Sequence, residues 1–178
     1  MISDWVCLAL ARGGDERAWR ILFERYHASL LRMTSLVTGS IDSAQDLVQE
    51  SFIRLLDCHI KHRDGSFKAF LTTMAYRLAL KEKHRKSSGD RLDGHTIADD
   101  APSPLEEAIL DERKRAIIRV VQSLPIHQRE ILALRFYGGH SYEEIARITE
   151  LPIGTVKSRL FYGVKTCQME LKKRGVFS

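Results

Sequence analysis

A stretch without any core-forming pattern divides this chain of 178 residues into two parts. Residues 87–104 are rich in Ser, Gly, Asp and Pro, and their few apolar residues follow neither a helical nor a strand period. Such a segment is typical of a flexible linker, which could extend to about 56 Å. We therefore expect two small domains, residues 1–86 and residues 105–178, joined by a linker at residues 87–104.

Both parts carry apolar residues at helical spacing, so the expected fold class is all-α. In the first part a short helix at about residues 3–11 precedes longer helices that have recognisable end signals. These signals are Asp15 and Gly39 for one helix, Asp42 with Gln45 at its capping-box position for the next, and Gly65-Ser66 for a third. In the third of these helices we expect Phe70 in the core and Tyr76 partly exposed.

The second part has the pattern of a helix-turn-helix domain. The expected helices lie at residues 105–124, 128–137, 142–148 and about 155–173. Pro125 stands where a helix starts well, and Ser141 with Glu144 fits a capping box. We therefore expect three helices after Pro125, the last of which would be the recognition helix.

The last expected helix has one apolar face and one polar and aromatic face. Val156, Leu160 and Val164 lie inward by their spacing. The residues that we expect to contact DNA are Thr155, Lys157, Ser158, Arg159, Phe161, Tyr162 and Lys165. A helix that reads the major groove needs such a second face, and outward aromatic rings fit a thymine methyl group or a partner protein better than water. An ordinary amphipathic helix is the alternative on this pattern alone.

Charge is distributed unevenly along the chain. Residues 87–112 carry eight acidic residues and one basic residue, whereas the segments before and after them have net charges of +4 and +8. Two basic segments around an acidic one favour a polyanionic partner, with solvated helix faces as the alternative.

Several classes of protein are disfavoured. The chain has no Gly-rich phosphate loop, HExxH motif or nucleophile elbow, so we expect no enzymatic activity and no cofactor. Cys58, His59 and His62 could approach a metal ion, but their spacing is not a standard zinc pattern. No apolar run approaches the ~20 residues of a membrane-spanning helix, and the N-terminus does not resemble a signal peptide. Three scattered cysteines indicate a reducing compartment, so we expect a cytoplasmic protein without membrane insertion.

A long motif lies within residues 121–165. It reads Leu-Pro-Ile-His-Gln-Arg-Glu-Ile-Leu-Ala-Leu-Arg-Phe-Tyr-Gly-Gly-His-Ser-Tyr-Glu-Glu-Ile-Ala, followed later by Pro-Ile-Gly-Thr-Val-Lys-Ser-Arg. This stretch resembles region 4 of the extracytoplasmic-function (ECF) sigma factors, small members of the sigma-70 family, in which it reads the −35 promoter element. Response regulators have a similar region, so this match alone is not decisive. The chain departs from the family at Thr149-Glu150, where Leu-Gly is usual.

A second motif, Asp-Ser-Ala-Gln-Asp-Leu-Val-Gln-Glu-Ser-Phe at residues 42–52, resembles region 2.2 of the same family. The residues that line the exposed side of this helix are Asp46, Gln49, Glu50 and Ile53. An acidic and amide face suits a basic partner helix. The resemblance implies that this partner is the clamp-helix coiled coil of the β′ subunit of RNA polymerase, with a solvated face as the alternative for the segment alone.

Residues 66–86 correspond, by the same resemblance, to regions 2.3 and 2.4, which melt and read the −10 element. The residues expected to contact this DNA are Tyr76, Arg77, Lys81 and Arg85. The family commonly has Trp, Asn and Asp where this chain has Phe70, Arg77 and Lys81. These differences predict stronger attraction to phosphate and leave the base preference open.

Together, the resemblances cover residues 15–86 and 105–172. They imply an ECF sigma factor that binds core RNA polymerase, through the β′ clamp helices and the β flap, and directs initiation at promoter DNA. An anti-sigma factor is expected as a further partner, and the acidic linker would run toward the RNA exit path. Two alternatives remain: a sigma-like decoy that binds an anti-sigma factor without initiating transcription, and a repressor that binds duplex DNA alone.

Overall fold

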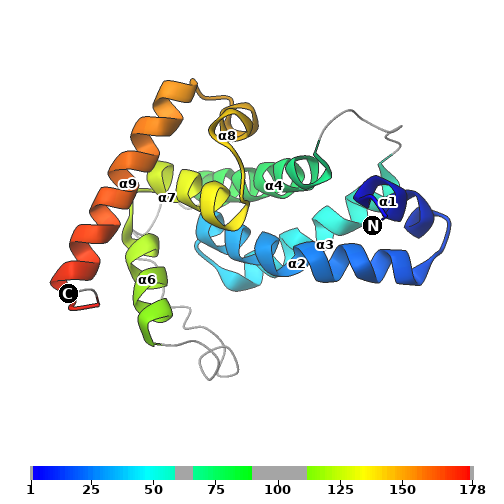
Figure 1. The fold of residues 1–178 in the computed structure, drawn as a ribbon, viewed down its shortest axis with the longest axis horizontal. Coiled ribbons are helices and arrows are strands. Elements are labelled where there is room, and N and C mark those ends of the chain that lie inside the picture. Colours follow the sequence, from blue (N-terminus) through cyan, green and yellow to red (C-terminus); the bar gives the residue numbers. More distant parts are fainter. Residues whose placement is uncertain (1, 59–65, 90–111, 177–178) are drawn as a thin grey trace.

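The computed structural model describes residues 2–58, 66–89 and 112–176, and within these ranges all regular structure is helical (Figure 1). The elements are α1 (Asp4–Arg12), α2 (Glu16–Thr38), α3 (Ile41–Asp57), α4 (Phe67–Gly89), α6 (Glu112–Ser123), α7 (Ile126–Leu132), the π-helix η1 (Ala133–Tyr137), α8 (Tyr142–Thr149) and α9 (Ile153–Lys173). The all-α prediction is confirmed. None of the helices described here is long and apolar enough to cross a membrane.

The first helical block is built around α2. Helices α1, α3 and α4 all pack on α2 (Figure 1). Their buried apolar residues belong to one hydrophobic cluster. The bulkiest fully buried side chains of this core are Leu8, Leu22, Met33, Phe52, Leu55 and Leu71. Asp15 caps α2 by accepting hydrogen bonds from the amides of Arg17 and Ala18, and Gly39 ends it with φ of 76°. Both predicted end signals of this helix are therefore confirmed.

The start of α3 differs from the prediction. Ser40 is the capping residue, and its hydroxyl accepts a hydrogen bond from the amide of Ser43. Asp42 lies in the first turn, where its charge favours the positive end of the helix dipole, and Gln45 is not at a capping-box position. Ser and Asp cap helices equally well, so the predicted pattern could not distinguish Ser40 from Asp42.

Arg12, at the end of α1, fixes the C-terminal end of α3. Its guanidinium donates hydrogen bonds to the carbonyl oxygens of Leu55 at 2.7 Å and Leu56 at 3.0 Å, and also to that of Cys58. These carbonyls belong to the last turn of α3, where a helix leaves acceptors without partners. The Arg12 guanidinium therefore satisfies the C-terminal carbonyl groups of α3 and connects α3 to α1.

Helix α4 begins as predicted, since the Ser66 hydroxyl accepts a hydrogen bond from the amide of Ala69 at 3.3 Å. It extends to Gly89 and thus includes the first residues of the predicted linker. The rest of the linker, and the beginning of the helix expected at 105–124, lie outside the described residues.

The second block is organised around α9, on which α6, α7 and α8 pack. Gly163 lets α7 approach α9 closely, because a Cβ atom there would lie 3.0 Å from Leu132 Cδ1. The helix expected at 128–137 begins at Ile126 and widens into a π-helix at Ala133. Residues 131–134 are all buried, so this segment is enclosed on several sides instead of having one exposed face.

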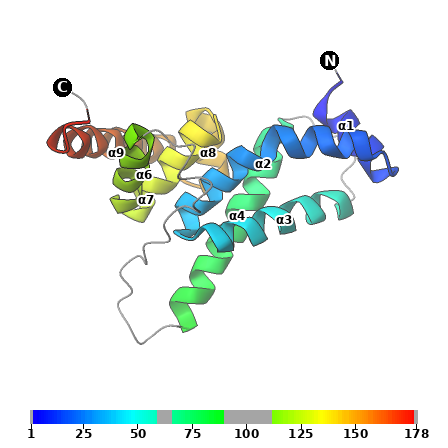
Figure 2. The same ribbon diagram turned by 90° about the horizontal axis from the view of Figure 1, so that it is seen from below.

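The two blocks lie directly against each other. Helix α7 and η1 pack on α2, and α8 packs on α4 (Figures 1 and 2). The buried residues of both blocks form one hydrophobic cluster. The segment of residues 131–134 is therefore buried between its own block and α2.

Candidate polymerase and DNA contact surfaces

The four residues predicted to bind polymerase share one side of α3. Asp46 and Gln49 are exposed, and Ile53 has 61% of its surface exposed, which is high for an isoleucine. Glu50 is partly covered and forms an ion pair with Arg54 at 2.5 Å. The opposite side of α3 is buried in the core, as its spacing predicted. This side of α3 therefore presents acidic, amide and apolar groups to a partner.

The predicted cationic residues of α4 form an exposed stripe. Arg77, Lys81 and Arg85 recur at intervals of four and are all exposed. Arg85 makes two hydrogen bonds with the carboxylate of Glu82, at 2.8 and 2.9 Å, which raise the pKa of its guanidinium. Arg77 forms an ion pair with Glu150 at 3.2 Å. The stripe is thus available at the surface but already has acidic neighbours.

Two aromatic residues of α4 take the opposite positions from those predicted. Tyr76, expected to be partly exposed, is only 4% exposed and donates a hydrogen bond to Glu130 of α7 at 3.3 Å. Burial, together with the Glu130 charge, raises the pKa of Tyr76. Phe70, expected in the core, is half-buried, with its ring 5.8 Å from that of Trp5. The physical reason is the second block, which covers the Tyr76 side of α4 and leaves the Phe70 side open.

An open cleft of about 530 Å³ lies between the end of α3 and α4. It is lined by Arg54, Cys58, Phe70, Thr73, Met74, Arg77, Leu78 and Lys81. Three cationic side chains thus meet an apolar and aromatic surface. This combination suits a ligand with both an anionic part and a flat apolar part, such as an unstacked nucleotide.

The sequence pattern did not identify Arg54 and Cys58 as residues of the cleft. Arg54 lies in the last turn of α3 and Cys58 directly follows this helix, but the motif on α3 indicated only a docking role. The metal site considered for Cys58, His59 and His62 lies mostly outside the described residues. Among the residues that the structure does describe, no three metal-ligating side chains come together.

The turn between α8 and α9 gives the helix-turn-helix its geometry. Ser141 and Glu144 form the predicted capping box at the start of α8, with both hydrogen bonds present. Glu150 ends α8 with φ of 59°, a left-handed conformation that favours glycine. Pro152 precedes α9, which begins at Ile153, two residues before the predicted start at about Thr155.

Helix α9 separates its faces as predicted. Val156 and Leu160 are buried, and Val164 is partly buried against the same core. The exposed residues of the predicted DNA-reading set are Lys157, Ser158, Phe161, Tyr162 and Lys165, whereas Thr155 and Arg159 are half-buried. Phe161 and Tyr162 are 62% and 56% exposed, and their rings meet edge to face at 5.4 Å. This exposed aromatic and cationic surface can contact both base edges and phosphates.

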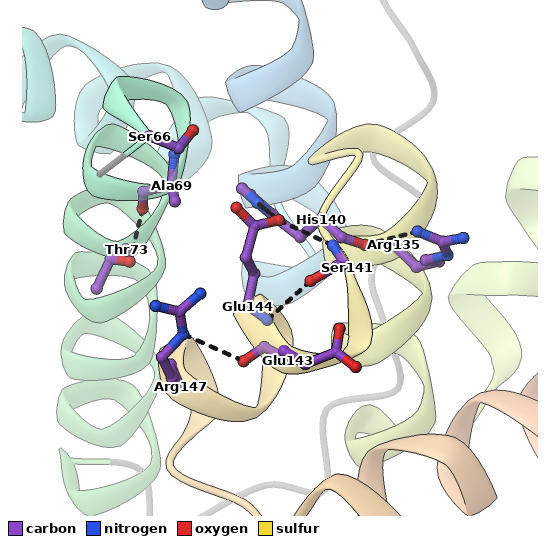
Figure 3. Close-up of polar contacts among 9 residues, drawn as sticks. All are labelled: Ser66, Ala69, Thr73, Arg135, His140, Ser141, Glu143, Glu144 and Arg147. Carbon is purple, nitrogen blue, oxygen red and sulfur yellow. Dashed lines mark hydrogen bonds and ion pairs between the residues drawn. The ribbon is translucent and has the colours of Figure 1, made fainter. Parts of the chain in front are cut away.

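A polar network surrounds the start of α8, on the side that faces α4 (Figure 3). His140 is 1% exposed, and its Nδ1 lies 3.6 Å from the Glu144 carboxylate. Burial lowers the pKa of His140; the charge of Lys68 on α4 acts in the same direction, and Glu144 opposes it. Arg135 donates a hydrogen bond to the His140 carbonyl at 2.8 Å. This network fixes the segment between η1 and α8 within the second block.

Comparison with known proteins identifies both blocks. The profile of "Sigma-70 region 2" matches residues 22–88, and that of "Sigma-70, region 4" matches residues 114–167. The chain is 30% identical over 172 residues to the ECF RNA polymerase sigma-E factor of Salmonella typhimurium, with 90% of each chain aligned. It is 31% identical over 163 residues to the RNA polymerase sigma-H factor of Pseudomonas aeruginosa, with 83% of each aligned.

Solved structures show the same fold. Sigma factor RpoE of Bartonella quintana, determined in complex with the anti-sigma factor NepR, has a TM-score of 0.64 at 26% identity, covering 86% of this chain and 96% of that one. CnrH, determined in complex with the cytosolic domain of CnrY, has a TM-score of 0.66 at 20% identity, covering 96% and 97%. Two profile matches in the order of a sigma factor, together with relatives of 30% identity along most of their length, show that the chain belongs to the ECF sigma factors of the sigma-70 family.

Proposed function

We propose that this sigma factor docks to core RNA polymerase through α3, holds an unwound −10 strand on α4 and reads −35 duplex DNA with α9. Residues 1–86 form the docking and strand-holding domain, residues 105–178 form the duplex-reading domain, and residues 87–104 link them. The observation that carries the proposal is the cleft between α3 and α4, where three cations meet an apolar surface.

The docking side of α3 fits a basic helical partner. Asp46 and Glu50 supply negative charge, Gln49 supplies amide groups, and Ile53 supplies an exposed apolar contact. Charge complementarity of this kind sets the orientation and association rate of a complex. The β′ clamp helices would be the partner at this side, and the β flap would contact the second domain.

Strand capture requires binding energy and no chemical step. Arg54, Arg77 and Lys81 can hold phosphates at the cleft, while Phe70 and Met74 offer surfaces for a base. Arg85 continues the cationic stripe along α4. Contacts made only with an unstacked strand offset the cost of unpairing it. Tyr76 is not assigned a direct role, because in this structure it is buried beneath the second domain.

We assign the recognition of duplex DNA to helix α9. Lys157, Lys165 and Arg159 supply positive charge for phosphates, and the N-terminal turn at Thr155 can add backbone amides. Ser158, Phe161 and Tyr162 are the residues placed to meet base edges. The −10 and −35 elements are about one and a half turns of duplex apart, roughly 50 Å, which the linker can span.

An anti-sigma factor is the expected regulator, since the RpoE relative was determined in complex with one. A protein with these partners would act in the cytoplasm. The decoy alternative is less well supported, because a decoy needs neither an open cationic cleft nor an exposed reading face, and both are present.

Charge reversal on the docking side tests the proposal. The variant Asp46→Arg with Glu50→Arg should lose co-purification with matching core polymerase and should give no run-off transcript. Glu24→Arg, an exposed acidic position on α2, is the matched control and should behave as wild type. Undiminished assembly of the double variant would overturn the docking assignment. Absence of any promoter-dependent transcript from genomic fragments with wild-type protein would overturn the proposed function.

A further inference from the structure

Phe70 supplies the aromatic surface of the cleft between α3 and α4. Among the described residues that line this cleft it is the one aromatic side chain, and it is half-buried. An unstacked base can lie on such a ring whatever its identity, because every base has a flat face. A ring that is free to change rotamer loses conformational freedom when a base binds, which weakens the complex. The contacts that hold the Phe70 ring therefore influence how well the cleft binds a base.

The aromatic neighbour of Phe70 is Trp5 of α1, which does not itself line the cleft. The two ring centroids are 5.8 Å apart, and the ring planes are tilted by 43°. Aromatic rings at this separation attract each other in addition to burying apolar surface. Both residues are partly buried and pack against the hydrophobic cluster. A residue from a different helix, 65 positions earlier in the chain, thus supports the ring at the cleft.

Trp5 is held in turn by further aromatic side chains. Its ring meets that of Phe67 edge to face, at 5.1 Å and an angle of 83°. Phe67 is 4% exposed, and its ring lies 5.4 Å from that of Tyr26 on α2. A continuous aromatic row therefore leads from α2 to the cleft, and its members in order are Tyr26, Phe67, Trp5 and Phe70.

Polar contacts anchor the far end of this aromatic row. Tyr26 Oη donates a hydrogen bond to the Asp4 carboxylate at 2.5 Å, and Arg25 forms an ion pair with the same carboxylate. Burial, together with the hydrogen bond to Asp4, raises the pKa of Tyr26, so its hydroxyl remains a donor at neutral pH. Asp4 directly precedes Trp5 in the first turn of α1. These contacts between α1 and α2 therefore fix the backbone from which Trp5 extends.

From these contacts we infer that Trp5 is a positioning residue for capture of the −10 strand, because it holds the Phe70 ring as a stacking surface for an unstacked base. The inference rests on the proposed function for the identity of that strand. Trp5 lies outside residues 22–88, the part of the chain that matches the region 2 profile. Base contacts and phosphate contacts are then separate contributions, since the cations of the cleft need no base and the Phe70 ring needs no charge.

Single strands with and without bases separate these two contributions. The probes are two fluorescent DNA strands of about 16 nucleotides, one a pool of mixed sequence and the other abasic throughout. Binding to the full-length protein is measured by anisotropy at low salt. Wild type should bind the mixed strand about ten-fold more tightly than the abasic strand. Trp5→Leu should reduce this preference to about two- to three-fold, as should Phe70→Leu, and each should change binding of the abasic strand by less than about two-fold.

The other tryptophan of the chain provides a matched control. Trp19 is also partly buried, its ring meets the buried Phe52 edge to face at 5.5 Å, and it does not line the cleft. Trp19→Leu should therefore keep the wild-type preference for bases. Trp5→Phe keeps a ring beside Phe70 and should retain most of the preference, which distinguishes loss of aromatic support from a general disturbance of α1.

Tryptophan fluorescence gives a second readout from proteins that keep their packing. In Trp19→Phe, Trp5 is the one tryptophan of the chain, and its emission should change when the mixed strand is added and remain the same with the abasic strand. In Trp5→Phe, the emission of Trp19 should remain the same with both strands.

Several outcomes would overturn the inference. These are equal preferences for bases in Trp5→Leu and Trp19→Leu, a wild-type protein that binds both strands equally, and a Trp5→Leu protein that loses binding to both strands to the same extent. Transcription with core polymerase separates the two claims. Wild type that never initiates refutes the proposed function, whereas an active protein whose Trp5→Leu variant binds and initiates as wild type does refutes the positioning role alone.

Discussion

Replacing Glu150 by glycine should make the protein more stable. The left-handed backbone at this position costs a glutamate about 1 kcal/mol relative to glycine. A negative charge at the C-terminal end of α8 also opposes the helix dipole by about 0.3 kcal/mol when exposed. Against these gains stands the ion pair with Arg77, whose exposure limits it to about 0.5 kcal/mol. The expected net gain in the free energy of unfolding is about 1 kcal/mol.

Urea unfolding followed by circular dichroism measures this gain, and thermal unfolding should show Tm about 2–4 °C higher. Two variants separate the contributions. Glu150→Gln keeps the backbone strain and should change stability by no more than about 0.5 kcal/mol. Gly39→Ala imposes the same left-handed cost at the end of α2, where a Cβ has open space, and should destabilise by about 1 kcal/mol. A Glu150→Gly protein that is less stable than wild type would show that the ion pair outweighs the strain.

Three further changes follow from contacts within the two domains. Arg12→Gln removes the charged hydrogen bonds at the end of α3 and should lower the free energy of unfolding in urea by about 2 kcal/mol, with Arg12→Lys intermediate because it lacks the fork. Gly163→Val would push a side chain into Leu132 and should cost about 1–3 kcal/mol by the same assay. Burial lowers the pKa of His140, so the folded state keeps it neutral; its contribution to stability is present above pH ~6.5 and is lost as pH falls below that value. Wild type should therefore lose more stability than His140→Gln between pH 7.5 and pH 5.5, and parallel curves would contradict this.

Features set by neighbouring residues were predictable from the sequence. The Ser141–Glu144 capping box, the stop at Gly39 and the faces of α9 depend on spacings of a few residues, and all three are confirmed. Helix α3 is capped by Ser40 and not by the predicted Asp42. Both residue types cap helices well and they stand close together, so only packing decides between them.

Features set by distant residues were not predictable in this way. Tyr76 is buried because Glu130 and the second domain cover it, and these residues are 54 positions apart in the chain. Phe70 is left at the cleft for the same reason, on the uncovered side of α4. The enclosure of residues 131–134 between α2 and α9 is likewise a property of domain packing, which no local pattern encodes.

The packing of the second block on the first has an apolar component in addition to its charged contacts. Helix α7 and η1 pack on α2, and Ala133 and Leu134 within this contact region are fully buried. Separating the two blocks would expose apolar surface to water at a free-energy cost of about 25 cal/mol per Å². An exposed ion pair, in contrast, contributes at most about 1 kcal/mol to the stability of the packed state. Removing the Glu130 and Glu150 carboxylates alone should therefore leave the two blocks packed together. Separating the two blocks therefore needs a partner that holds both of them and covers the apolar surface that they bury against each other.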